Sequence, residues 1–275
     1  MPLFDGLSLL TDPSRRATGY PTARLQKGLL LADRGHSLAE EGVGFGVPIL
    51  KRGVVTVFPG SVELAAQRIC SGAVWEVTAA YHMNLIERLA KPGGGRVRSD
   101  ALHTTKNALA ALHRRSRVLR GPLTAASATL RRAFGWVTTY EEISSWATLT
   151  VTHTIRAELG TIDITVDMTG LPPDGFTEIV LMNEQGAHHF DRYRDSGGAD
   201  LRGAAIGTWD QVGAETASFV SDAHAVAFSL GQVDGARLNR GRELIGARLA
   251  WSGFGYSVPP TCGRFAYSLS IERTS

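Results

Sequence analysis

Cysteine and lysine are both scarce in this chain. Two cysteines, Cys70 and Cys262, occur among 275 residues, which is too few for a disulfide scaffold, and their spacing does not fit a metal site. They either form one bridge or remain thiols in a reducing cytoplasm. Lysine supplies 4 of the 29 basic residues and arginine the other 25. We interpret that ratio mainly as the coding bias of a GC-rich genome.

Signals for export or membrane insertion are missing as well. Residues 1–5 contain no basic segment leading into an apolar stretch, so they do not read as a secretory leader. No run approaches the roughly 18 apolar residues that a membrane-spanning helix needs. We therefore expect a soluble, cytoplasmic protein without membrane contact. A secreted form whose leader has been removed stays open.

The composition is that of a packed globule. Hydrophobic residues make up 43% and charged residues 20%, which excludes a largely disordered chain. The length suits one large β domain, and 31 glycines are enough for many turns between short strands. We predict a single β-rich domain over residues 1–275.

Period-two alternation of apolar and polar residues is the clearest structural signal. Such alternation is typical of antiparallel strands with one buried face. It covers residues 75–85, 149–155, 162–168 and 265–271, and the two stretches around Gly160 predict a hairpin. Shorter candidate strands are 25–32, 54–58, 176–182, 216–221, 224–230 and 244–251. The prediction is a mainly β fold: an antiparallel β-sandwich, supersandwich-like in one version, or a barrel.

A basic helical insertion interrupts this pattern around residues 99–134. Ser99 is a suitable N-cap, and helix formers follow it. Lys91–Arg132 contains ten basic residues and one acid, a charge of +9, so the rest of the +3 chain carries −6. The segment fits a solvated arginine face or a surface for an anionic partner. It has no aromatic residue, which disfavours nucleic acid. It also fits a lid, or a contact between copies in a homo-oligomer.

A glycine-spaced segment, Glu40 to Pro48, does not fit a phosphate-binding loop because an extended run follows it where a helix would be needed. We interpret it as a loop whose backbone can approach a ligand, with Glu41 at its mouth. Gly253-Phe254-Gly255 partly repeats it. The repeat is either chance or a second loop at the same end of a sandwich.

The densest run of reactive side chains is 183–195, which follows an apolar strand as a cleft-lining loop would. If residues 188–193 are extended, His189, Asp191 and Tyr193 share one face and can act as acid, base and orienting group. Glu184 and Glu41 can supply the two carboxyl groups of glycoside cleavage. These five are the predicted catalytic residues. A polar hairpin with surface ion pairs is the structural alternative for the run.

The remaining site predictions concern ligand contacts. Trp209 and Asp210 lie in a glycine-flanked stretch, where an indole can stack on a sugar ring. With His188 and Arg192 they are the predicted substrate-binding residues. We predict no metal, because adjacent histidines on a strand point to opposite faces and no second histidine pair supports them. No cofactor is expected.

The second half of the chain, with acids and histidines on loops, resembles in a general way the sandwich folds of carbohydrate-active enzymes. This resemblance is at the level of fold and implies no residue role. The leading hypothesis is a glycoside hydrolase or lyase with its site at one end of the sandwich. The alternatives are a non-catalytic module for glycans or anionic ligands, and a small-molecule cyclase or isomerase with an apolar β-barrel pocket.

Overall fold

The computed structural model describes ten segments of the chain. They are residues 1–11, 28–39, 43–52, 55–69, 74–90, 137–144, 147–172, 175–244, 250–260 and 263–274. The predicted helical insertion at 99–134, with the basic segment, lies outside them, as do both cysteines and Glu41. Within these segments no helix is long and apolar enough to cross a membrane.

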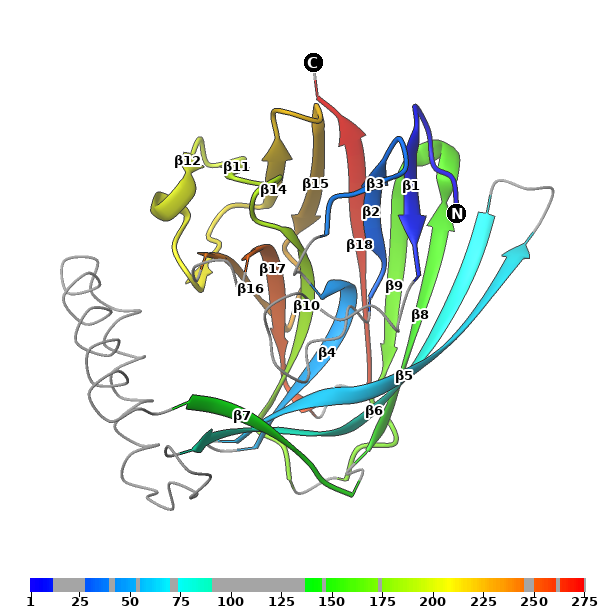
Figure 1. Ribbon diagram of the computed structural model, residues 1–275, viewed down its shortest axis with the longest axis vertical. Coiled ribbons are helices and arrows are strands. Elements are labelled where there is room, and N and C mark those ends of the chain that lie inside the picture. Colours follow the sequence, from blue (N-terminus) through cyan, green and yellow to red (C-terminus); the bar gives the residue numbers. More distant parts are fainter. Residues whose placement is uncertain are drawn as a thin grey trace.

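Two antiparallel sheets make up the described fold (Figure 1). The small sheet contains β1 (Leu7–Leu10), β2 (Leu30–Asp33) and β3 (His36–Ser37). The large sheet runs, in spatial order, β12 (Asp200–Arg202), β11 (Arg192–Asp195), β14 (Thr216–Ser221), β15 (Val226–Gly231), β18 (Arg264–Arg273), β9 (Thr161–Asp167), β8 (Thr148–Arg156), β6 (Val74–Ala90), β5 (Val55–Ile69), β4 (Gly44–Arg52), β10 (Glu178–Gly186), β17 (Ala250–Val258), β16 (Arg237–Leu244) and β13 (Asp210–Gln211). β7 (Val137–Glu142) also pairs with β6, and two 3-10 turns cover Ala157–Leu159 and Gly203–Ile206. The predicted mainly β, antiparallel architecture is confirmed.

The large sheet curls so that its two halves pack face to face. Phe45 of β4 contacts Phe228 of β15 with ring centroids 5.2 Å apart, and Phe254 of β17 contacts Phe219 of β14 at 4.8 Å. The long strands β5 and β6 bend as they cross between the halves (Figure 1). In the described residues the strand path has two ends, β12 and β13. Within the described residues the large sheet is therefore one curled antiparallel sheet with two ends and facing halves.

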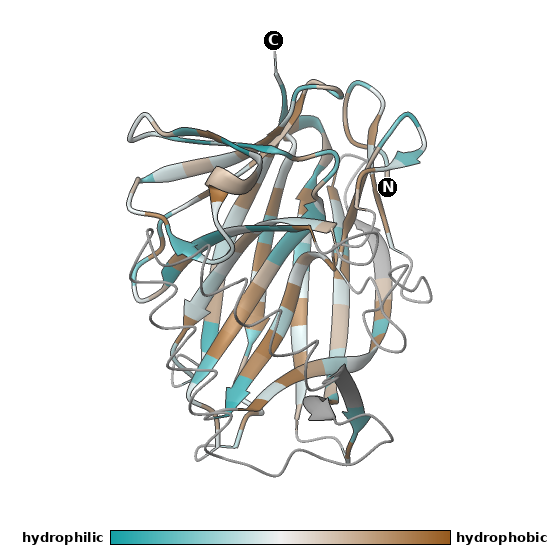
Figure 2. Ribbon diagram, turned by 60° about the vertical axis from the view of Figure 1, so that its left-hand side comes forward, coloured by the Kyte–Doolittle hydropathy of each residue, from teal (hydrophilic) through white to brown (hydrophobic). Residues whose placement is uncertain are grey.

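The alternating stretches fold as the sequence predicts. β8 and β9 bury every second residue, and hydrophobic and polar bands alternate along the long strands in Figure 2. Gly160 joins these two strands with φ of 62°, and a Cβ there would lie 2.2 Å from the carbonyl oxygen of Ile271. Only glycine fits that turn without displacing a neighbour. The predicted hairpin is confirmed.

Three predicted boundaries are wrong, each because backbone pairing extends into polar or glycine-rich sequence. Gly44–Gly46, expected in a loop, begins β4. Asn183–Gly186, also expected in a loop, forms the last part of β10: all four residues pair with β17, and Asn183 and Glu184 also pair with β4. Of the candidate strand at residues 244–251, Leu244 ends β16 and Ala250 begins β17, so its described ends belong to two different strands; residues 245–249 lie outside the described segments.

Candidate functional site

Three consecutive polar residues lie fully buried on β10. Asn183, Glu184 and Gln185 each have 0% of their surface exposed. Alternation along a strand directs Asn183 and Gln185 to one face and Glu184 to the other. The two amides and the carboxylate therefore lie in different surroundings, on opposite faces of the sheet.

The two amides use their hydrogen bonds to hold the fold. The Asn183 Oδ1 accepts from the Gly46 N–H at 3.1 Å and from the Tyr267 hydroxyl at 3.0 Å, which links β10 to β4 and to β18 in the facing half. The Gln185 Oε1 accepts from the Leu31 N–H at 3.0 Å, and its Nε2 donates to the Leu29 carbonyl at 3.2 Å. Gln185 thus fastens the small sheet to the large one.

Glu184 lies between two positions that have no side chain. Gly44 of β4 and Gly253 of β17 are directly opposite it. A Cβ on Gly253 would lie 2.0 Å from the Asn183 carbonyl oxygen, and a Cβ on Gly44 would lie 2.7 Å from the Gly28 carbonyl carbon. Both glycines are therefore required by close backbone contacts. No Cβ therefore stands directly opposite Glu184 on either neighbouring strand.

The two Gly-Phe-Gly segments flank this position symmetrically. Phe45 and Phe254 are both opposite Asn183, on either side of β10, and both rings contact Phe228. The two Gly-Phe-Gly segments that repeat in the sequence thus lie on either side of β10, in strands and not in loops. It places Glu184 at the centre of a glycine, carboxylate, glycine row.

The segment that carries Glu41 is fixed to the same strand at both of its described ends. The Val43 N–H donates to Glu184 Oε2 at 3.3 Å, and the Gly186 N–H donates to the Leu38 carbonyl at 2.8 Å. Glu41 itself lies outside the described residues.

Two tryptophans pack on the Glu184 face of the layer. The benzo edge of Trp209 occupies the space where a Cβ of Gly255 would lie, and Trp251 does the same at Gly241. Their ring centroids are 6.3 Å apart, and the Trp251 Nε1 donates to Glu243 Oε2 at 3.1 Å. Trp251 is buried and Trp209 partly exposed. The predicted platform Trp209 thus shares a face with Glu184, and Asp210 follows it on β13 opposite Arg240.

The histidine segment forms a turn and not the predicted extended run. The N–H groups of His189 and Phe190 both donate to the Gly186 carbonyl, at 3.1 and 3.0 Å. His188 is exposed, and the ring of the partly buried His189 meets that of His224 edge to face, with centroids 5.1 Å apart. His224 comes from the turn between β14 and β15.

An aspartate orients that second histidine. The Nδ1 of His224 lies 3.2 Å from Asp33 Oδ2, and Arg273 donates to Asp33 Oδ1 at 2.7 Å. The hydrogen bond from Arg273 lowers the pKa of Asp33, and the bond with His224 acts in the same direction. The sequence gives no local sign of Asp33, His224 and Arg273 as a group, because they are far apart in the chain and form no motif.

The structure does not bring His189, Asp191 and Tyr193 together. Asp191 lies 4.0 Å from Arg202. Tyr193 is fully buried: its hydroxyl donates to Asp195 at 2.8 Å and its ring lies under the Arg240 guanidinium. Burial raises the pKa of Tyr193, and its hydrogen bond to Asp195 adds to the shift. The turn before β11 changes which residues share a face, so the predicted grouping is wrong.

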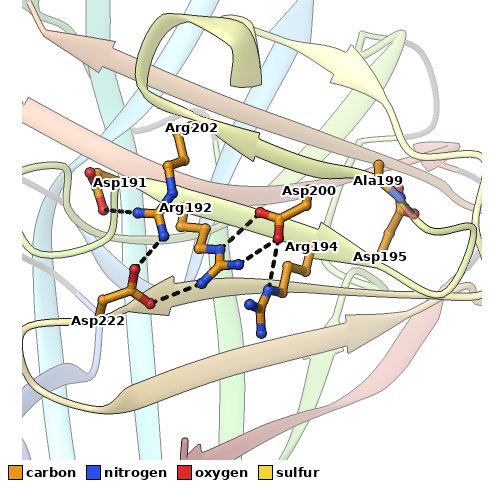
Figure 3. A network of polar contacts seen from close by, with 8 residues as sticks. All are labelled: Asp191, Arg192, Arg194, Asp195, Ala199, Asp200, Arg202 and Asp222. Carbon is orange, nitrogen blue, oxygen red and sulfur yellow. Dashed lines mark hydrogen bonds and ion pairs between the residues drawn. The ribbon is translucent and has the colours of Figure 1, made fainter.

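Arg192, predicted to bind substrate, belongs to a surface network of ion pairs. Its guanidinium lies between Asp200 and Asp222, and Asp222 also pairs with Arg202 (Figure 3). The hydrogen bond from Arg192 lowers the pKa of Asp200 to about 2. Every charge of the network faces an opposite charge within it. In the described residues no group of three or more His, Cys, Asp or Glu side chains is arranged to hold a metal ion.

Comparison with known proteins yields only distant structural likeness. No family model and no curated protein sequence matches the chain. The α-N-acetylgalactosaminidase NagBb from Bifidobacterium bifidum, in complex with GalNAc, superimposes with a TM-score of 0.48 at 10% identity. That superposition covers the whole of this chain and 36% of NagBb. The protein HI1317 gives a TM-score of 0.35 at 7% identity, over 97% of this chain and 99% of its own. None of these likenesses assigns a role to a residue of this chain.

Proposed function

We propose that this protein is a carbohydrate-active enzyme in which Glu184 and Glu41 form the carboxyl pair that cleaves a glycosidic bond. The observation that carries the proposal is the contact between the Val43 N–H and the Glu184 carboxylate. Val43 follows Glu41 by two residues in the chain, and it contacts a carboxylate whose cross-strand neighbours are glycines. Glycoside cleavage needs two carboxyl groups, one to protonate the leaving oxygen and one to attack or to activate water.

The surroundings of Glu184 suit a sugar. Trp209 lies on the same face and keeps part of its indole exposed, so it can stack against a sugar ring. His189 lies in the turn that follows β10 and is the assisting acid or base in the lyase version. Asp191 and Tyr193 have their own partners in Arg202 and Asp195 and receive no catalytic role.

The test is a panel of glycosides and of neutral and acidic polysaccharides. We expect Glu184→Gln and Glu41→Gln each to lower turnover by about 10²- to 10⁴-fold, the usual contribution of a positioned acid or base. Glu158→Gln, at an exposed position in the turn between β8 and β9, is the matched control and should keep full activity. New reducing ends identify a hydrolase, and unsaturated sugars identify a lyase. Full activity of Glu184→Gln would exclude this pair.

A non-catalytic glycan-binding module is the second candidate, and the two neighbouring indoles favour it. In that case wild-type protein binds a glycan saturably without turnover. Trp209→Ala then weakens binding, whereas Glu184→Gln leaves it intact. An apolar barrel pocket is not favoured, because the two halves of the described sheet are in direct contact through aromatic rings such as Phe219, Phe228 and Phe254.

A further inference from the structure

The inner face of the same strands carries a second row of polar side chains. Arg242 of β16 is directly opposite Ser252 of β17, and Ser252 is directly opposite Gln185 of β10. Because alternate residues point to opposite faces, this row lies on the other side of the layer from Glu184. It adjoins the sandwich end at which β10 turns into the histidine segment.

Two members of this row have buried hydrogen-bonding atoms with no partner among the described residues. Ser252 is fully buried, and within the described part of the chain its Oγ has no hydrogen-bond partner. The Arg242 Nε is also buried and has no hydrogen-bond partner among the described residues. The Nη2 of the same side chain donates to the Ala187 carbonyl at 3.0 Å. Gln185, in contrast, is fully engaged with Leu29 and Leu31. Buried polar atoms without partners are rare in native proteins and mark places where a ligand or water completes the structure.

Arg242 has no direct counter-ion among the described residues. No carboxylate of the described residues lies within ion-pair distance of it, and burial lowers its pKa. The negative charge of Asp191 raises the pKa of Arg242 from a longer distance. Asp191 has Arg202 as its own partner, at 4.0 Å. Arg240, two residues earlier on the same face, is held by the carbonyls of Ile206 and Gln211 and adds a second positive charge. A partly buried guanidinium in such a place is stabilised by an anion.

We propose that Arg242 and Ser252 form a binding site for a small oxyanion, either the carboxylate of an acidic sugar or a phosphate group. A guanidinium offers N–H groups in a planar fork that matches both oxyanions, and a serine hydroxyl adds a third donor. The site is on the opposite face of the layer from Glu184. It is therefore a separate site and does not depend on the proposed glycoside cleavage.

Titration calorimetry with wild-type protein and three probes tests this site: glucuronate, inorganic phosphate and neutral glucose. We expect saturable binding of at least one of the two oxyanions and none of glucose. Binding of glucuronate alone assigns an acidic sugar, and binding of phosphate alone assigns a phosphate group. If neither oxyanion binds, the unused atoms are filled by water only and the proposal is wrong.

Two arginines of β16, Arg242 and Arg237, provide a matched pair of variants for the binding test. Arg242→Gln should weaken oxyanion binding by about tenfold or more, the usual effect of losing a charge-assisted hydrogen bond. Arg237→Gln changes an exposed arginine of the same strand that pairs with Glu178, and should leave binding unchanged. Equal affinity of Arg242→Gln and wild type would overturn the site. Glu184→Gln should bind the oxyanion normally, which separates this test from that of the proposed function.

A measurement on the folded wild-type protein avoids any effect of the variants on folding. The Nε–H resonance of Arg242, assigned by its loss in Arg242→Lys, should shift as glucuronate or phosphate is added. The dissociation constant obtained from this shift should equal the one obtained by calorimetry. Arg242→Lys keeps the charge but loses the planar fork, so we expect several-fold weaker binding. A resonance that does not move during saturating binding would place the oxyanion elsewhere and overturn the assignment.

Discussion

The polar triplet on β10 and the ion-pair network of β11 and β12 differ in their access to water. Asn183, Glu184 and Gln185 are fully buried, whereas Arg194 and Asp200 of the network are about half exposed. A buried group that loses its partner keeps the full cost of desolvation, while an exposed group exchanges its partner for water. We therefore expect the few buried contacts to hold the fold more strongly than the many exposed ones.

The largest effect is expected at Asn183. Asn183→Leu leaves the Gly46 N–H and the Tyr267 hydroxyl buried without an acceptor. We expect a loss of about 2 to 4 kcal/mol in the free energy of unfolding, measured in urea. Tyr267→Phe removes only one donor and should cost less. An Asn183→Leu variant as stable as wild type would contradict the expectation that the buried contacts stabilise the fold more than the exposed ones.

Gln185→Ala should give a smaller and more local loss. It releases the Leu29 carbonyl and the Leu31 N–H, which hold β2 against the large sheet. We expect about 1 to 3 kcal/mol and faster hydrogen exchange at Leu31, with exchange in β8 and β9 unchanged outside global unfolding. Acceleration spread evenly over both sheets would show that Gln185 does not act as a local fastening.

Asp33 should make stability depend on pH in the acid range. Arg273 and His224 lower its pKa below the unfolded value of about 3.9. A lowered carboxyl pKa gives stability that is present above the unfolded pKa and lost as the pH falls through the folded pKa. The difference in unfolding midpoint between wild type and Asp33→Asn should thus be constant above about pH 5 and shrink below pH 4. A difference that grows on acidification would contradict this coupling.

Arg194→Gln should have the smallest effect. Its partner Asp200 is also paired with Arg192, and both members of the pair are exposed. We expect a change in the unfolding midpoint close to experimental error, and none in concentrated salt, where exposed charges are screened. A loss as large as that of Asn183→Leu would show that exposure does not decide the strength of these contacts.

Local pattern predicted the parts of the fold that depend on neighbours in sequence. The alternation at residues 149–155 and 162–168 and the turn at Gly160 are each visible within a few residues, and they gave β8 and β9 correctly. The end of β10 was missed because Asn183, Glu184 and Gln185 look like a loop. Their partners lie far away in the chain.

The site depends almost entirely on long-range contacts. Val43 and Glu184 are 141 residues apart, and Asp33 and Arg273 are 240 apart. The chemistry of Glu184 and Trp209 could be predicted from residue type, but the register that places both on one face could not. The repeated Gly-Phe-Gly was the only local sign of that register, and the sequence alone did not distinguish strands from loops there.

The most direct test of the account measures turnover and unfolding free energy on the same samples of wild type, Glu184→Gln and Tyr267→Phe. We predict that Glu184→Gln loses glycoside cleavage while its stability stays near that of wild type, because the amide keeps an oxygen for the Val43 N–H. Tyr267→Phe should lose stability and, where folded, keep its turnover. Glu184→Gln with full turnover, or with turnover lost only in proportion to unfolding, would show that Glu184 serves the fold and not the chemistry.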